Sequence, residues 1–305
     1  MTFLMRAAMA VIGACATTAA VAAEPTFSTV AGHGGVPLVV AEAGNRQGPP
    51  ILFIHGYSQS YLSWEKQLGD ADLARDFHLI ALDLRGHGGS AKPTQPEDYS
   101  SEAWAGDIAA VIAATTAKKP VLVPWSMGGT VTFAYVKHKG VAGIAGVNFV
   151  AAATLLGDPP TQSAAEIERG KAFSSQLMGM LSPDMALNIA ATRWFVGALT
   201  KNPLPAPEQE RIVAYNMTTP AYVRQAMFAR GPIDFRDQAA RMTVPALFSH
   251  GDQDDVVAYQ LSVDNARRLP NATLSNYAGI GHAPFLEDPA RFNRELAAFV
   301  RGVQP

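Results

Sequence analysis

Short apolar runs alternate along the chain with longer segments in which apolar residues recur at helical spacing. The short runs cover residues 36–41, 51–54, 77–82, 121–123, 147–151, 246–249 and 273–277. Runs this short and apolar predict strands that are covered on both faces. Apolar residues share one face of a predicted helix in two places, at Trp104, Ile108 and Val111 and at Phe292, Leu296, Phe299 and Val300. The pattern predicts an α/β fold in which helices flank a mainly parallel twisted sheet.

The alternation stops between about residues 155 and 240. This stretch contains no convincing strand, begins with Pro159-Pro160 and otherwise has helical patterning. We predict that residues 155–240 form an inserted helical cap, and that residues 24–154 and 241–305 form the core. The large apolar side chains of the cap either line an adaptable pocket or fill the cap's own core; they are Met178, Met180, Met185, Met217, Met227, Trp194 and Phe195.

Residues 1–23 have the pattern of a secretory signal peptide. Arg6 precedes an uncharged, mostly apolar stretch, and small residues at positions 20–23 offer a cleavage site before Glu24. The stretch is Ala-rich and short for a membrane span, so we expect an exported protein, periplasmic or secreted, without a stable span in the mature chain. As an alternative, Ile12-Gly13-Ala14-Cys15 resembles the lipobox of bacterial lipoproteins, in which Cys15 would be acylated.

Composition narrows the possible partners and cofactors. With 48% hydrophobic and 16% charged residues, a long disordered chain is excluded. Cleavage before Glu24 leaves 23 basic and 26 acidic residues, a net charge of −3, and the densest basic runs are Lys118-Lys119 and Arg267-Arg268. We therefore expect no nucleic-acid partner.

Cleavage also removes Cys15, the only cysteine, and no HExxH or similar His pair occurs, so we expect neither a disulfide nor a bound metal. The sequence gives no indication of oligomeric state.

The segment most informative about chemistry is Val121-Leu122-Val123-Pro124-Trp125-Ser126-Met127-Gly128-Gly129, between a predicted strand and a predicted helix. A serine at such a turn presents its hydroxyl beside the helix N-terminus, and the next backbone N–H, from Met127, can stabilise an oxyanion. Pro124 stands where the G-x-S-x-G pattern has its first glycine. Taken alone, Ser126 fits an ordinary helix N-cap equally well.

Further segments follow other predicted strands. They are Ile54-His55-Gly56-Tyr57, Asp83-Leu84-Arg85-Gly86-His87-Gly88-Gly89-Ser90, Ser249-His250-Gly251-Asp252-Gln253-Asp254 and Gly281-His282-Ala283-Pro284. With these segments in this order, the chain resembles the α/β-hydrolase family over most of residues 36–152 and 243–303. The resemblance implies the α/β-hydrolase fold.

The resemblance also implies a role for individual residues. Ser126 would be the nucleophile and His282 the general base. Asp252, Asp254 and Asp255 all follow the strand predicted at residues 246–249. Similarity to the family's G-x-x-D pattern selects Asp254 as the acid. The backbone N–H groups of Tyr57 and Met127 would form the oxyanion hole.

Other residues near the expected site have less specific roles. The rings of Trp125 and Tyr57 either contact substrate or pack in the core. A structural role is expected for His55, His250, Arg85 and His87, because equivalent positions in relatives look structural. Asp158 is an alternative acid, although it lies at the start of the predicted cap.

A serine nucleophile favours acyl transfer, so the first expectation is hydrolysis of a small-molecule carboxylic ester or lactone through an acyl-enzyme. No organic cofactor is expected, since neither a Walker A nor a G-x-G-x-x-G sequence is present. The short His55-Gly56-Tyr57 turn resembles that of non-haem haloperoxidase-type esterases and lactonases. Non-haem haloperoxidase or perhydrolase activity and acyl-homoserine lactone hydrolysis are the alternatives. More distant ones are carbon–carbon bond hydrolysis and a non-catalytic ligand-binding module.

Overall fold

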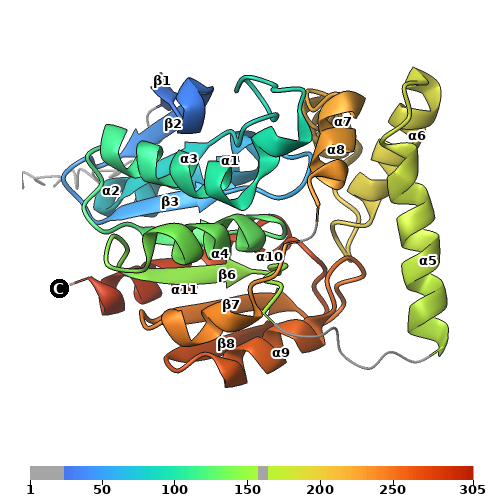
Figure 1. Ribbon diagram of the computed structural model, residues 1–305. Coiled ribbons are helices and arrows are strands. Elements are labelled where there is room, and N and C mark those ends of the chain that lie inside the picture. The colour runs from blue at the N-terminus through green and yellow to red at the C-terminus, as the bar shows by residue number, and fades with distance from the viewer. Residues whose placement is uncertain (1–23, 157–163, 232, 305) are drawn as a thin grey trace, which may run out of the picture.

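The chain folds into an eight-stranded sheet covered by helices, as the computed structural model in Figure 1 shows. The structure describes residues 24–156, 164–231 and 233–304. The predicted signal segment with Cys15 and the alternative acid Asp158 lie outside these residues. The strands are β1 (Thr26–Ala31), β2 (Pro37–Gly44), β3 (Pro50–Ile54), β4 (His78–Leu82), β5 (Val121–Pro124), β6 (Gly146–Val150), β7 (Ala246–Gly251) and β8 (Ala272–Tyr277).

Helices connect the strands and cover both faces of the sheet. They are α1 (Glu65–Leu68), α2 (Ala71–Asp76), α3 (Ser101–Ala114), α4 (Gly128–Lys139), α5 (Ala164–Gly179), α6 (Met185–Gly197), α7 (Ala206–Asn216), α8 (Ala221–Ala229), α9 (Tyr259–Arg268), α10 (Pro284–Glu287) and α11 (Pro289–Val303). Short 3₁₀ segments lie at His33–Gly35, Tyr61–Trp64, Pro96–Tyr99 and Arg236–Arg241.

The strand order is β1-β2-β4-β3-β5-β6-β7-β8. β2 runs antiparallel to β1 and β4, and the remaining neighbours are parallel. The predicted fold class and all seven predicted strands are confirmed. The sequence pattern missed β1, because this edge strand buries only Val30 and therefore carries no apolar run.

Alternate side chains of the central strands enter two separate cores. Leu52 and Ile54 of β3 face one core, which α3, α4 and α9 cover, whereas Ile51 and Phe53 face the other, which α1, α2 and α11 cover. All residues of β3, β4, β5 and β6 are buried, which explains why their sequences are apolar apart from His78 and Asn148. Apolar burial on both faces fixes the sheet and thus the positions at which its strands end.

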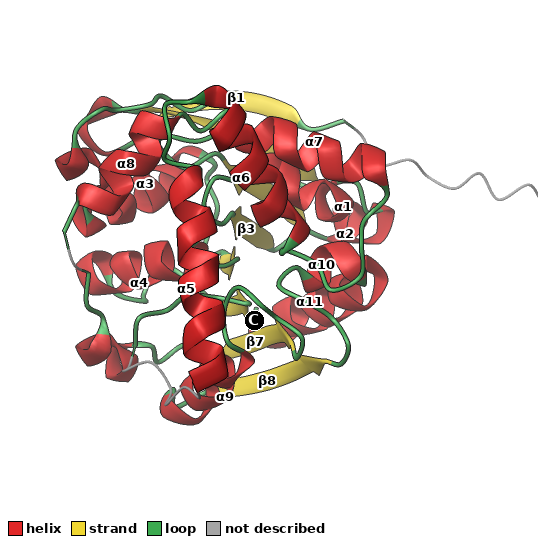
Figure 2. Cartoon of the chain, turned by 90° about the vertical axis from the view of Figure 1, so that its right-hand side faces the viewer, coloured by secondary structure: helices red, strands yellow, loops and turns green. Residues whose placement is uncertain are grey.

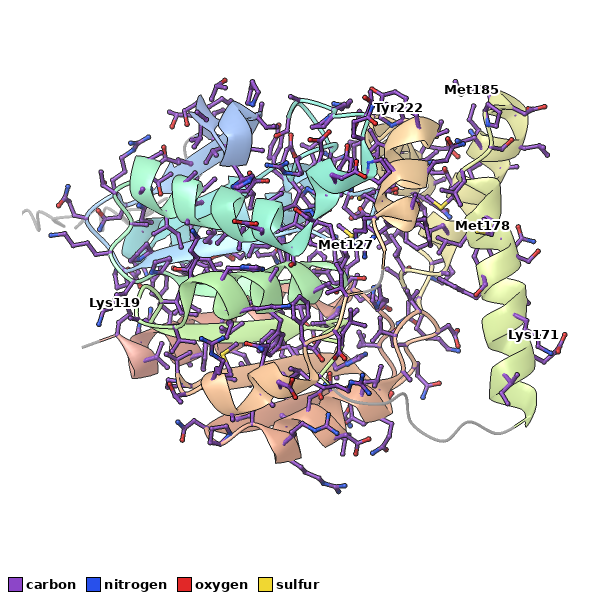
Figure 3. The ribbon with its side chains drawn as sticks, viewed as in Figure 1. Lys119, Met127, Lys171, Met178, Met185 and Tyr222 are labelled. Carbon is purple, nitrogen blue, oxygen red and sulfur yellow. The ribbon has the colours of Figure 1, made fainter. Side chains whose placement is uncertain are left out.

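Four helices, α5 to α8, lie between β6 and β7 in the chain, and we call them the cap helices. Figure 2 shows α5 crossing in front of the sheet, beside α6. The large apolar side chains of this segment have mixed environments. Met180, Met227 and Phe195 are buried, whereas Met178, Met185 and Trp194 are exposed. Figure 3 places Met178 and Met185 on the helices farthest from the sheet. Packing inside the molecule thus accounts for the buried side chains of this group but not for the exposed ones.

No helix within the described ranges is both long enough and apolar enough to cross a membrane.

Candidate active site

Ser126 occupies a strained turn between β5 and α4. Its φ is +55°, in the left-handed region that non-glycine residues rarely adopt. Hydrogen bonds hold the turn, because the Ser126 N–H donates to the Val150 carbonyl at 3.0 Å and its carbonyl accepts from Ala153 at 2.9 Å. A Cβ at Gly128 would lie 2.6 Å from the Ile54 carbonyl oxygen, so the helix can start this close to β3 only with glycine there.

Pro124, the departure from the family pattern, is the last residue of β5. The strand continues its pairing beyond it, since the Trp125 N–H donates to the Ile54 carbonyl at 2.9 Å. The missing N–H of proline therefore does not interrupt the turn that carries Ser126.

Asp254 and His282 come together from loops that follow β7 and β8. The Nδ1 atom of His282 lies 2.7 Å from Asp254 Oδ2, and both side chains are buried. Asp254 Oδ1 accepts the backbone N–H groups of Val256 at 2.7 Å and Val257 at 2.9 Å. Burial alone would raise the pKa of Asp254, but the electrostatic interaction with His282 and hydrogen bonds from two histidines hold it below its usual range. Asp254 is therefore an anion that orients the His282 ring.

The other two aspartates of this loop point elsewhere. Asp252 Oδ1 accepts the Gly279 N–H at 2.8 Å, and Asp255 is exposed. Of the three candidates, only Asp254 contacts His282. The selection of Asp254 through the G-x-x-D resemblance therefore agrees with the geometry.

Two unoccupied backbone donors lie in the turns around Ser126. Among the described residues, neither the Tyr57 N–H nor the Met127 N–H donates a hydrogen bond. The turn with Tyr57 abuts the serine, because a Cβ at Gly56 would lie 3.0 Å from Ser126 Cβ and 3.5 Å from its Oγ. Free N–H groups beside a nucleophile are the arrangement that stabilises an oxyanion.

The buried Nε2 atom of His282 also has no hydrogen-bond partner within the described part of the chain, and Ser126 Oγ makes no hydrogen bond there. A bond between the two is therefore not formed in this structure. Such bonds in hydrolases often tighten only when substrate is bound.

The two aromatic residues predicted near the site have different environments. Trp125 is 1% exposed, and its Nε1 donates to the His282 carbonyl at 2.9 Å. The ring packs against His282 and Phe285, so of the two roles expected for Trp125 the structure shows packing. Tyr57 is half-buried, and its ring meets the edges of Phe195 and Phe228 from the cap helices. Tyr57 thus remains the candidate for substrate contact.

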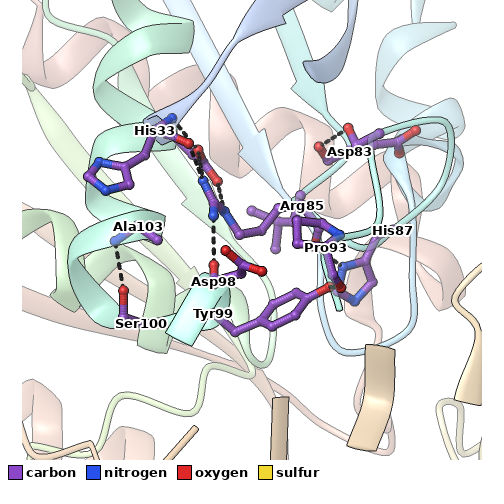
Figure 4. A network of polar contacts seen from close by, with 12 residues as sticks. His33, Asp83, Arg85, His87, Pro93, Asp98, Tyr99, Ser100 and Ala103 are labelled. Carbon is purple, nitrogen blue, oxygen red and sulfur yellow. Dashed lines mark hydrogen bonds and ion pairs between the residues drawn. The ribbon is translucent and has the colours of Figure 1, made fainter. Parts of the chain in front are cut away.

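The turn after Tyr57 is held from the core side by His87. Ser58, at φ +59°, donates its N–H to His87 Nε2 at 3.2 Å, and His87 Nδ1 lies 2.9 Å from the Arg85 carbonyl. Arg85 in turn binds Asp107 through two bonds of 2.6 and 2.7 Å, in the network of Figure 4. Burial lowers the pKa of His87 to about 4, so the ring is neutral and can accept the Ser58 N–H.

We expect this neutral histidine to make stability depend on pH. Between pH 6.5 and 4, His87 binds a proton in the unfolded chain but not in the folded one, so the free energy of unfolding falls as pH is lowered. The loss due to His87 is at most about 3 kcal/mol. The measurement is urea unfolding at pH 7 and at pH 4.5. Between these two pH values, the free energy of unfolding should fall less in His87→Gln than in the unchanged protein. Burial also lowers the pKa of His55, but this residue is present in both proteins and therefore does not affect the comparison. Equal losses would contradict the expectation.

From the cap side the same turn is held by Arg224 of α8, which is fully buried. Its Nε donates to Ser58 Oγ at 2.9 Å, and its other nitrogens donate to Met180 O at 2.9 Å, Asn188 Oδ1 at 2.8 Å and Asn216 O at 2.7 Å. None of these acceptors is a carboxylate. Arg224, on α8, therefore joins the end of α5, α6 and the end of α7 to the turn that carries the Tyr57 N–H.

On the other side of the site, Glu287 joins the cap to the loop of His282. Its carboxylate accepts the N–H groups of Gly281 at 2.7 Å, Lys201 at 3.1 Å and Asn202 at 2.9 Å. Gly281 directly precedes His282. The cap is thus anchored beside both His282 and the turn that carries the Tyr57 N–H.

Replacing Arg224 with methionine is expected to lower the free energy of unfolding by about 3 kcal/mol or more, because four buried acceptors lose their donor. The measurement is chemical denaturation at pH 7. Arg193→Met is the matched control, since Arg193 is exposed on α6 and its partner among the described residues is the exposed Glu210. We expect a change within about 0.5 kcal/mol for that control. Similar losses in both variants would show that the Arg224 network does not stabilise the cap.

Sequence reasoning did not find Arg224, Glu287 or the contact of His250 with Asp254. His250 lies four residues before the acid, and its Nε2 is 2.8 Å from Asp254 Oδ2. Their partners are 4 to 166 residues away in the chain or are backbone atoms, so no spacing rule indicates them. Within the described residues, no group of three His, Cys, Asp or Glu side chains is arranged to hold a metal ion.

Comparison with known proteins places this site in a family. A model of the alpha/beta hydrolase fold matches residues 49–289. The chain is 35% identical to the structure of a putative aryl esterase from Burkholderia cenocepacia, with a TM-score of 0.81, and the match covers 91% of this chain and 99% of that chain. It is 32% identical to the esterase RhEst1 from Rhodococcus sp. ECU1013, with a TM-score of 0.78 and the same coverage. It is 27% identical to the non-heme chloroperoxidase of Streptomyces lividans, over 90% of this chain and 100% of that protein. These matches confirm the resemblance seen in the sequence motifs, and the chain belongs to the α/β-hydrolase fold family.

Proposed function

We propose that this protein is a serine hydrolase that cleaves small carboxylic esters through an acyl-enzyme on Ser126. The observation that carries the proposal is the Asp254–His282 hydrogen bond of 2.7 Å, with Ser126 held at φ +55° next to Trp125, whose Nε1 bonds the His282 carbonyl. The unoccupied N–H groups of Tyr57 and Met127 supply the remaining part of an acyl-transfer site. Similarity to two esterases at 35% and 32% identity supports the same reaction class.

The proposed reaction has two halves. In the first, His282 Nε2 takes the Ser126 proton while Oγ attacks the ester carbonyl, and the N–H groups of Tyr57 and Met127 stabilise the oxyanion. Protonated His282 then gives its proton to the departing alcohol. In the second half, His282 deprotonates a water molecule that attacks the acyl-enzyme. Protonated His282 then returns its proton to Ser126 Oγ as the carboxylic acid leaves. Anionic Asp254 stabilises the imidazolium in both halves.

The cap side of the site favours apolar or aromatic substrates. Phe195 and Phe228 meet the Tyr57 ring edge-on, with centroids 6.2 and 5.9 Å away. Aromatic edges and faces bind planar groups well. We therefore propose esters with a small aromatic or apolar acyl or alcohol group, in agreement with the similarity to a putative aryl esterase. Lactones are esters that the same oxyanion hole would accept.

The experiment that tests the proposal is labelling with a p-nitrophenyl phosphonate, a reagent that serine hydrolases attack as they attack esters. We expect one p-nitrophenol released per protein molecule and one phosphonyl group on the peptide containing Ser126, by mass spectrometry. Rates on p-nitrophenyl acetate, hexanoate, laurate and phenylacetate then report the acyl preference. Absence of labelling together with absence of turnover would refute the proposal and favour a non-catalytic binding module.

A second candidate is perhydrolase activity, which the similarity to a non-heme chloroperoxidase favours. Hydrogen peroxide would replace water as the acceptor, so that the acyl-enzyme yields a peracid and free Ser126. The peracid would then oxidise halide in solution. Halogenation of a chromogenic acceptor in acetate and peroxide, lost in Ser126→Ala, would support this activity, and unchanged halogenation in that variant would refute it.

We also propose that the chain is exported after removal of residues 1–23. The support is the charged, apolar and small-residue order of that segment. Mass spectrometry of the protein from the periplasm or culture medium of an expressing bacterium tests this. A mature N-terminus at Glu24 is expected, whereas a lipid-modified N-terminus at Cys15 would favour the lipoprotein alternative.

A further inference from the structure

A second histidine binds the carboxylate that orients His282. His250 lies in β7, one residue from its end, and is fully buried. Its Nε2 is 2.8 Å from Asp254 Oδ2 and 3.1 Å from the Val257 carbonyl oxygen. The other ring nitrogen, Nδ1, lies 2.6 Å from Ser262 Oγ of α9. The ring is thus held at both ends.

These partners determine where the ring carries a proton. Asp254 Oδ2 and the Val257 carbonyl are acceptors only, so Nε2 must carry hydrogen whether the ring is neutral or charged. Nδ1 meets a hydroxyl, which can donate or accept. His250 is therefore a fixed N–H donor to Asp254, and Ser262 fixes the direction in which it donates.

Asp254 consequently has four donors. Val256 and Val257 bind Oδ1, while His250 and His282 share Oδ2 at 2.8 and 2.7 Å. Donors on both oxygens prevent rotation of the carboxylate. In addition, a donor on the oxygen that His282 uses withdraws negative charge from it, which weakens the pull of the carboxylate on the imidazolium proton.

The titratable groups that face His250 come from three directions. Asp254 lies on the loop after β7, and His282, on the loop after β8, shares its oxygen. Tyr259 of α9 meets the His250 ring edge-on at 5.6 Å. Asp252 is turned away, since its Oδ1 accepts the Gly279 N–H. Among the described residues, Asp254 is thus the ionised side chain that His250 contacts directly.

We propose that His250 is a positioning residue for the Asp254–His282 pair: it holds the carboxylate in line with His282 and limits how strongly His282 retains a proton. This inference rests on the proposed function, in which neutral His282 is the base. Removal of the His250 N–H then leaves a carboxylate that holds the proton on His282 more strongly. His282 then loses its proton only at higher pH. The acid-side midpoint of the pH–rate profile therefore moves to higher pH.

The test compares His250→Phe with His250→Gln. Phenylalanine fills the space without a donor, whereas glutamine offers an amide N–H near the position of Nε2. We expect His250→Phe to lower kcat for p-nitrophenyl acetate by about 10- to 100-fold with little change in KM. Its acid-side midpoint should rise by about one pH unit. His250→Gln should restore most of kcat and the original midpoint.

His55→Phe is the matched control for loss of a buried histidine. His55 also precedes a glycine at a strand end, but its ring contacts Gly56 and Leu84 and neither Asp254 nor His282. Its acid-side midpoint should not move. If His250→Phe does not fold, Ser262→Ala, which frees the far end of the ring, should shift the midpoint in the same direction by a smaller amount.

An unchanged midpoint in the folded His250→Phe protein, or in Ser262→Ala if His250→Phe does not fold, would overturn the inference. So would a midpoint shift of equal size in His250→Gln and His250→Phe. Failure of the proposed function gives a different result, because the unchanged protein would then neither react with the phosphonate at Ser126 nor turn over esters.

Discussion

Replacement of Ser126 with alanine is expected to lower kcat/KM for p-nitrophenyl esters by about 10⁴-fold or more. The variant keeps the oxyanion donors of Tyr57 and Met127 but has no atom that can form the acyl-enzyme. Because these donors still bind the carbonyl, KM should change little. Any remaining rate would come from water attack within a site that still stabilises the oxyanion.

Initial rates of the purified variant and unchanged protein measure this effect, with phosphonate labelling as a second readout. Ser28→Ala is the control, since Ser28 is exposed on the edge strand β1 and remote in sequence from the site. It should keep full activity and labelling. Turnover by Ser126→Ala within tenfold of the unchanged protein would mean that another residue carries the chemistry.

We expect the fold of Ser126→Ala to be retained and its stability to increase slightly. Ser126 sits at φ +55°, where any side chain with a Cβ is strained, so alanine does not relieve the backbone. It does remove a hydroxyl that has no hydrogen bond among the described residues. A large loss of stability would instead indicate that Ser126 has a structural role such as the helix N-cap.

The parts of the fold that the sequence predicted are those in which burial acts on consecutive residues. β3 to β6 are covered on both faces, so their apolar runs could be identified without knowledge of the partners. β1 is exposed along most of its length and, in the described part of the chain, lies at the edge of the sheet beside β2. Its polar sequence gave no indication of a strand. Edge strands are determined by backbone pairing, which leaves little trace in side-chain pattern.

The site was predictable only to the extent that its residues follow strand ends. Ser126, Asp254 and His282 each follow a strand of a parallel sheet, whose carboxyl ends meet at one edge, so their proximity follows from topology. Arg224 approaches from a cap helix whose packing no pattern specifies. The burial of Trp125 was likewise unpredictable, because it depends on the backbone of His282 157 residues away.

Asp254→Asn is expected to lower kcat by about 10⁴-fold while leaving the fold intact, and the reason lies in the four donors around this side chain. The N–H groups of Val256 and Val257 both point at Oδ1, so asparagine must place its carbonyl oxygen there. Its NH₂ group then occupies the position of Oδ2 and faces the rings of His250 and His282. His282 Nδ1 would have to accept a hydrogen bond where it now donates one. The proton of the neutral ring would move to Nε2, and a protonated Nε2 cannot take the proton of Ser126. Loss of the carboxylate charge also removes stabilisation of the imidazolium.

The expected signature is a low kcat that recovers in part at high pH, where hydroxide can replace the missing base. Asp255→Asn is the matched control, because Asp255 is the adjacent residue, carries the same charge and is exposed. It should retain full activity, and circular dichroism should show the same fold for both variants. Retention of a tenth or more of kcat by Asp254→Asn would contradict the argument, since it would mean that His282 keeps its tautomer without the carboxylate. Equal loss in both variants would instead point to a general effect of charge on this loop. A large loss confined to Asp254→Asn would show that the Asp254 carboxylate itself, and not the charge of the loop, supports catalysis.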